Sequence, residues 1–195
     1  MKNTRLGAVV IAAAALFSVP ASGYAWNIIC GVSVLSFGDV KMSSKWEADS
    51  VAIRGISEFY KAISELQNVN VEIALAPASA EKPAEITKIQ SATTALKASA
   101  SSFQNAIEKA NALSSAANPM DSIGKQSIAL WKKMSDYNTA FATALDGGML
   151  PDLYELHEAI DVVHQIDNLG MRASLMHLNQ HKDAHTSGGH AATFK

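Results

Sequence analysis

The sequence predicts an all-α protein, an up-down antiparallel helical bundle of about four helices that follows an N-terminal signal peptide. Two observations support this fold class. Apolar residues recur with helical spacing through most of the chain, and residues that break helices separate the periodic segments. The connections between the later segments are short, which favours antiparallel neighbours. No alternation of strand and helix patterns and no internal repeat points to another class.

The N-terminus has the parts of a secretory signal peptide. Lys2 and Arg5 form a short positive region before the apolar run at 6–17. This run has the length of a signal-peptide core and is too short to span a bilayer, which needs roughly 20 apolar residues. Small residues follow it, and they predict cleavage after Ala25, with Ala21 as the second candidate. An uncleaved anchor is the alternative. We therefore expect an exported protein, periplasmic or secreted.

Charge narrows the range of partners. Removal of residues 1–25 leaves 14 basic and 18 acidic residues, a formal charge of −4, and no run of Lys and Arg. Nucleic acid is not expected as a partner, because binding to phosphates needs a positive face. Stable membrane insertion is not expected after cleavage either. The single cysteine, Cys30, excludes an intramolecular disulfide, and it is either a buried small residue or half of an intermolecular disulfide.

The segment after the leader and the first helix are the least regular part of the pattern. Residues 26–40 are apolar and β-branched, which fits a strand, a short helix on the bundle or a segment that inserts into a partner; a piece packed on the bundle is favoured. The first helix is predicted from Ser44, which forms a capping box with Glu47. It should continue toward Ala76, although the apolar residues at 69–75 alternate with strand spacing.

Three further helices follow. The second should start near Pro83, and its apolar stripe advances in steps of three and four, the seam of a bundle or coiled coil. The third should start at Asn118, a favoured N-cap residue, and end at the glycine pair 147–148. The fourth opens at Pro151, and Gly170 either ends or kinks it.

The predicted organisation has four parts. They are a signal peptide at residues 1–25, an apolar N-terminal segment at 26–43, a helical bundle domain at 44–185 and a flexible tail at 186–195.

All six histidines lie in the last forty residues, and this is the only unusual clustering in the sequence. Imidazole and carboxylate groups suit zinc, copper or nickel. Such histidines are also common at the border of an apolar face without any metal, and this alternative stays open. The missing ligands would come from a carboxylate on another helix, from water or from another subunit. The predicted ligands are His157, Asp161 and His164, spaced i, i+4, i+7 on one helix edge, together with His177 and His181.

No catalytic motif is present. The chain contains no Gly-x-Ser-x-Gly, His-Glu-x-x-His, phosphate-binding glycine loop, haem attachment site or Glu-x-x-His pair of the di-iron bundles. We therefore expect an exported, non-catalytic helical-bundle protein without a cofactor that acts by protein–protein interaction or self-assembly in the cell envelope. The alternative is a periplasmic metal-binding protein that uses the C-terminal histidines. A periplasmic hydrolase with a dispersed site is a third class.

Overall fold

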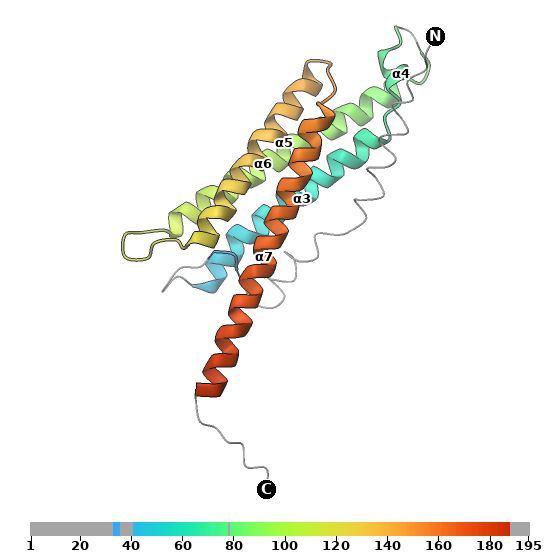
Figure 1. Cartoon of the computed structure of the whole chain (residues 1–195). Coiled ribbons are helices and arrows are strands. Elements are labelled where there is room, and N and C mark those ends of the chain that lie inside the picture. Colours follow the sequence, from blue (N-terminus) through green and yellow to red (C-terminus); the bar gives the residue numbers. More distant parts are fainter. Residues whose placement is uncertain (1–32, 36–40, 78, 188–195) are drawn as a thin grey trace.

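The computed structural model describes residues 33–35, 41–77 and 79–187, without the side chains of 42, 177, 178 and 180–187. The predicted signal peptide and Cys30 lie outside these residues. The described part holds five helices and no strand (Figure 1). The helices are α3 (Met42–Gln67), α4 (Val71–Leu75), α5 (Lys82–Leu113), α6 (Ser122–Asp146) and α7 (Leu153–Ser187).

The predicted all-α class is confirmed, and the arrangement is compatible with a helical bundle. Helix α5 packs against α3 and α6, and α6 packs against α7. Figure 1 shows the long helices side by side, with the C-terminal part of α7 extending beyond the others. None of the helices in the described part is both long and apolar enough to cross a membrane.

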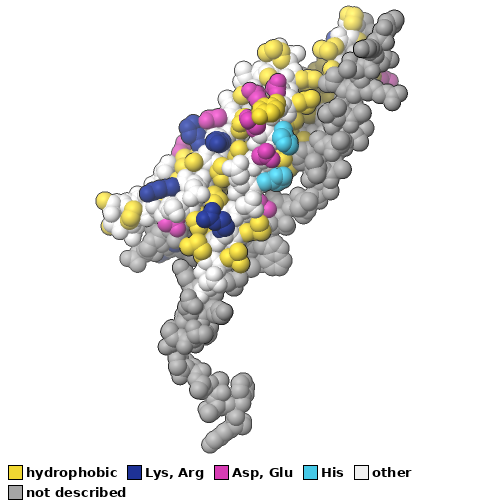
Figure 2. All heavy atoms as spheres, in the orientation of Figure 1, with side chains coloured by type: hydrophobic (Ala, Val, Ile, Leu, Met, Phe, Trp, Pro, Cys, Tyr) yellow, Lys and Arg dark blue, Asp and Glu magenta, His cyan; other side chains and the backbone are white. Residues whose placement is uncertain are grey.

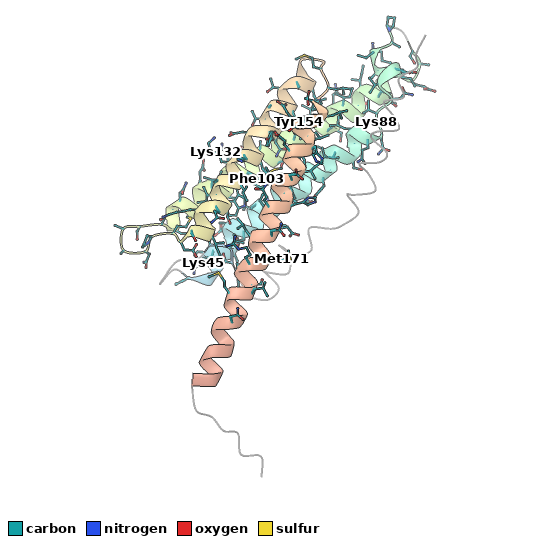
Figure 3. All side chains as sticks on the ribbon, in the orientation of Figure 1. Lys45, Lys88, Phe103, Lys132, Tyr154 and Met171 are labelled. Atoms are coloured by element: carbon teal, nitrogen blue, oxygen red, sulfur yellow. The ribbon has the colours of Figure 1, made fainter. Side chains whose placement is uncertain are left out.

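The core lies where α5 meets α3 and α6. Phe103 of α5 is fully buried, and it occupies the centre of the bundle in Figure 3. Its ring lies so close to Gly55 of α3 that an added Cβ there would come within 2.9 Å of the ring edge. The small residues of α5 are buried as well, because α5 is covered on one side by α3 and on another by α6. These residues are Ala92, Ala95, Ser99, Ala100, Ala106 and Ala110.

The predicted capping box at the start of the first helix is wrong. Helix α3 begins at Met42, so Ser44 already lies inside it, and the N-cap residue Lys41 makes no side-chain capping bond. The Glu47 carboxylate instead accepts a hydrogen bond from Lys109 Nζ of α5 at 2.6 Å. Lys109 of the neighbouring helix, and not Ser44 of the same helix, is therefore the partner of the Glu47 carboxylate.

The first helix also ends earlier than expected, and the alternating residues after it form no strand. Helix α3 stops at Gln67, and the separate short helix α4 follows, with the Asn70 side chain accepting from the Ile73 N–H at 3.2 Å. Two side chains of α5 hold this break. The Glu85 carboxylate accepts from the Asn70 N–H at 2.5 Å, and Lys88 Nζ donates to the Asn68 carbonyl at 2.7 Å.

Glu85→Gln is expected to lower the free energy of unfolding at neutral pH. Hydrogen bonds from Lys88 and from the Asn70 N–H hold the pKa of Glu85 below its usual value of 4.5. A carboxylate with a depressed folded-state pKa stabilises the fold above its unfolded pKa, and this contribution is lost as the pH falls through the folded value. The gap between wild type and variant in urea midpoint should therefore be full at pH 7 and should shrink below about pH 4.5. Glu108→Gln, at an exposed position of α5, is the matched control.

The boundaries of the later helices agree with the sequence except at one cap. Pro83 lies in the first turn of α5, and Gly147 caps α6, with Gly148 at a φ of +74°. The predicted N-cap Asn118 is wrong, because α6 begins four residues later and the Asp121 carboxylate accepts from the Gly124 N–H at 2.8 Å. Helix α7 continues through Gly170, which neither ends nor interrupts it.

Residues 33–35 show part of the apolar N-terminal segment. Val34 and Leu35 are each 1% exposed and belong to the same hydrophobic core as the helices. The Leu35 N–H donates to Ser33 Oγ at 3.0 Å. These three residues are neither helical nor in a strand. Residues 33–35 are therefore packed on the bundle, which is the alternative favoured for this segment in the sequence analysis.

Candidate functional site

The exposed edge of α7 carries the predicted ligands His157, Asp161 and His164. The three side chains are exposed, because the inward face of this helix is the one that carries the buried residues Ile160 and Val163. His157 Nε2 lies 3.9 Å from Asp161 Oδ2. Figure 2 shows the histidine side chains on this face with an acidic side chain between them. The structure therefore places these three residues together on one accessible edge.

They do not converge on a single point within one molecule. His157 and His164 are seven residues apart, which is about 10 Å along a helix, too far for one metal ion to bind both. Among the described residues, no group of three or more His, Cys, Asp or Glu side chains is arranged to hold a metal. His177 and His181 lie on α7, but their side chains lie outside the described part. Metal binding by these five residues stays a prediction.

A second polar feature lies inside the bundle. Asn138 Nδ2 of α6 donates to Ser99 Oγ of α5 at 2.9 Å, and the Ser99 hydroxyl donates to the Gly55 carbonyl of α3 at 2.6 Å. This chain of hydrogen bonds joins three helices in the core and fixes their relative positions. Within the described part, four buried side-chain atoms have no hydrogen-bond partner: Trp46 Nε1, Ser127 Oγ, Trp131 Nε1 and Asn138 Oδ1.

Three ionisable groups besides Glu85 have a shifted pKa among the residues that the structure describes. The Tyr137 hydroxyl donates to Glu158 at 2.8 Å, and this bond raises the pKa of Tyr137. Burial, with a smaller effect of Asp167, raises the pKa of Tyr60. Both shifts favour the protonated tyrosine, which is a poor general base. Burial lowers the pKa of Lys45, although the Asp121 charge opposes this shift.

The exposed apolar residues are the feature that the sequence reading missed. Apart from Leu75 of α4 and Ile86 of α5, the exposed large apolar residues of the described part lie in two places: at the α6–α7 turn and start of α7, and near the point where α7 leaves the bundle. Leu153 follows the apolar spacing of α7, but it is 50% exposed. Figure 3 shows Tyr154 of the first group and Met171 of the second at separate places along α7. The first group is Met149, Leu150, Leu153 and Tyr154, and the second is Met171, Leu175 and Met176.

A signal for the first group was present in the sequence. Four apolar residues stand within the six-residue stretch 149–154, next to two glycines that end the preceding helix. A turn between helices is usually polar, so apolar residues there indicate a contact surface.

Comparisons with known proteins add no family to this picture. No protein-family model, no curated protein and no solved structure matches the chain.

Proposed function

We propose that this protein is exported and acts without catalysis, as an up-down antiparallel helical bundle that associates with a second protein surface in the cell envelope. The second surface is, first of all, another copy of the chain. Residues 1–25 direct export, and the processed protein is periplasmic or secreted.

The observation that carries this proposal is the exposure of apolar side chains along α7. Tyr154 is 72% exposed and Leu175 is 60% exposed, and each has exposed apolar neighbours. Single exposed apolar residues are common, but groups of them on one element mark interaction surfaces. Burying such a group stabilises a complex by about 25 cal/mol for each Å² of apolar surface removed from water, before the cost of association.

The projecting part of α7 supports the same proposal. A single helix outside a bundle buries none of its sides against its own chain, and most helical stability in proteins comes from packing. A helix that runs to Ser187 beyond its neighbours is therefore suited to packing against a partner (Figure 1). An amphipathic helix that lies against another apolar surface is a common mode of recognition.

Sedimentation velocity over a range of protein concentrations tests this function. The chain is produced with its own leader, without a histidine tag, and purified from the envelope fraction. We expect the average mass to rise with concentration, and Leu153→Ser with Leu175→Ser to hold the protein at the monomer mass. Leu75→Ser, which is 71% exposed on α4, is the matched control and should associate like the wild type. A monomer at every concentration would contradict self-association.

A further inference from the structure

Along the exposed side of α7, the order of residue types is similar whether it is followed from the N-terminal or from the C-terminal end. At about 100° per residue, eight exposed residues of the described part fall within about 80° of one another on this helix. Asn168 and Asn179 are two of them, and the other six are histidine, aspartate or apolar. The histidines and the aspartate occupy the middle, and apolar residues occupy both ends. We call this surface the outer strip of α7. It consists of Leu153, His157, Asp161, His164, Met171 and Leu175.

One copy of the outer strip offers only half of a metal site. Successive turns bring His157 and Asp161 within reach of one ion, or Asp161 and His164, but not both histidines. A zinc ion usually takes at least three protein ligands. No third group from the described part of the chain joins either pair.

A second copy completes the site if the two α7 helices run antiparallel. A twofold axis that passes between residues 160 and 161 places His157 of one copy at the same height as His164 of the second copy. Packed helices have axes about 8–10 Å apart, a separation that two imidazoles and one ion can bridge. Asp161 lies close to the axis, so each copy supplies one carboxylate. The pair of helices then holds two equivalent ions, each with two imidazoles and one carboxylate.

The same axis brings the ends of the strip together. Because the axis lies between residues 160 and 161, Met171 of one copy is level with Leu150 of the second copy and about one helical turn from its Leu153. Leu175 lies farther out, beyond the start of the second α7. Apolar side chains therefore meet apolar side chains at both ends of the contact. A surface patch that meets itself in this way is the usual basis of a twofold dimer.

We propose that a divalent transition-metal ion, zinc in the first instance, joins two copies of this protein through His157, Asp161 and His164 of their antiparallel α7 helices. This inference rests on the proposed function and assigns a ligand and a register to the same surface. Binding needs no covalent or redox step, because neutral imidazoles and ionised carboxylates coordinate the ion directly.

The test measures mass and metal content together, with zinc chloride as the probe. The processed, tag-free protein carries His177→Ala and His181→Ala, which removes two of the other candidate ligands. Sedimentation velocity in EDTA and in zinc should show a doubling of mass in zinc, with one ion bound per chain. Adding His157→Ala and His164→Ala should weaken zinc-dependent dimerisation by at least about tenfold. These two side chains are exposed, so circular dichroism should be unchanged.

Four outcomes would overturn the inference, and the first three separate it from the proposed function. Zinc bound to a protein that stays at the monomer mass would contradict a site between two copies. Self-association that is equal in EDTA and zinc would leave the proposed function standing without the metal. If His177→Ala with His181→Ala alone abolished the zinc-dependent dimers, the zinc ligands would lie near residues 177–181 and not on the outer strip. A monomer at all concentrations, with or without zinc, would contradict both proposals.

Discussion

Phe103→Ala is expected to lower the free energy of unfolding by about 3–5 kcal/mol. The Phe103 ring is fully buried on the central helix α5, which packs against both α3 and α6. Its ring edge fills the space above Gly55, where α3 comes close enough that no side chain fits. Removal of the ring leaves a cavity between two long, straight helices, and their backbones cannot move together enough to fill it. The free energy of unfolding of the variant should therefore fall by most of the cost of the cavity.

Urea unfolding followed by circular dichroism at 222 nm, a wavelength dominated by helix, measures this effect. Ile86→Ala is the control on the same helix, since Ile86 is 38% exposed and its truncation should cost well under the amount for Phe103, about 1 kcal/mol or less. Similar midpoints for the two variants would mean that α3 and α5 do not pack through Phe103.

The helices themselves could be predicted because their apolar spacing is regular. Along α6, Ile123, Ser127, Met134 and Phe141 follow the helical spacing and are buried, whereas Leu130, Tyr137 and Ala144 of the same stripe are half-buried. Along α7, Ile160 and Val163 are buried as well. A core that is filled by residues at steps of three and four requires that pattern in the sequence. Glycine endings were also predictable, because Gly148 adopts a φ of +74° that other residues rarely take.

The helix ends were less predictable where distant residues compete with local ones. Glu47 fits a capping box by sequence, yet Lys109 of α5 takes its carboxylate. The break after Gln67 is held by Glu85 and Lys88, which lie in another helix and give no local signal. A sequence reading sees only neighbours along the chain, so it misses partners that folding brings near.

For the candidate site, the edge occupied by His157, Asp161 and His164 could be predicted, but its isolation within one molecule could not. Whether a fourth group from another helix reaches this edge depends on how α7 lies against its neighbours. Within the described residues, no side chain from another helix joins these three to form a metal-binding group, so a second copy is the source of ligands that we propose. The exposed apolar ends of the same helix point in that direction too.

Leu35→Ala is expected to lower the free energy of unfolding by about 2–5 kcal/mol, the range for a leucine truncated in a core. Leu35 is 1% exposed, and it lies outside every helix, in the stretch 33–35 that packs with the core of the bundle. The same urea titration measures the change. Leu75→Ala is the matched control, because Leu75 is 71% exposed and its loss should alter stability by less than about 0.5 kcal/mol.

The result decides which apolar surface is left for partners. A large loss of stability means that the stretch around Leu35 is committed to the protein's own core, so it cannot also insert into another protein. Association must then use the apolar ends of the outer strip of α7, which are exposed in the folded monomer. An unchanged midpoint would mean that the bundle does not need this leucine. The segment after the leader would then compete with α7 as the contact surface, and the Leu153→Ser and Leu175→Ser pair would fail to abolish association.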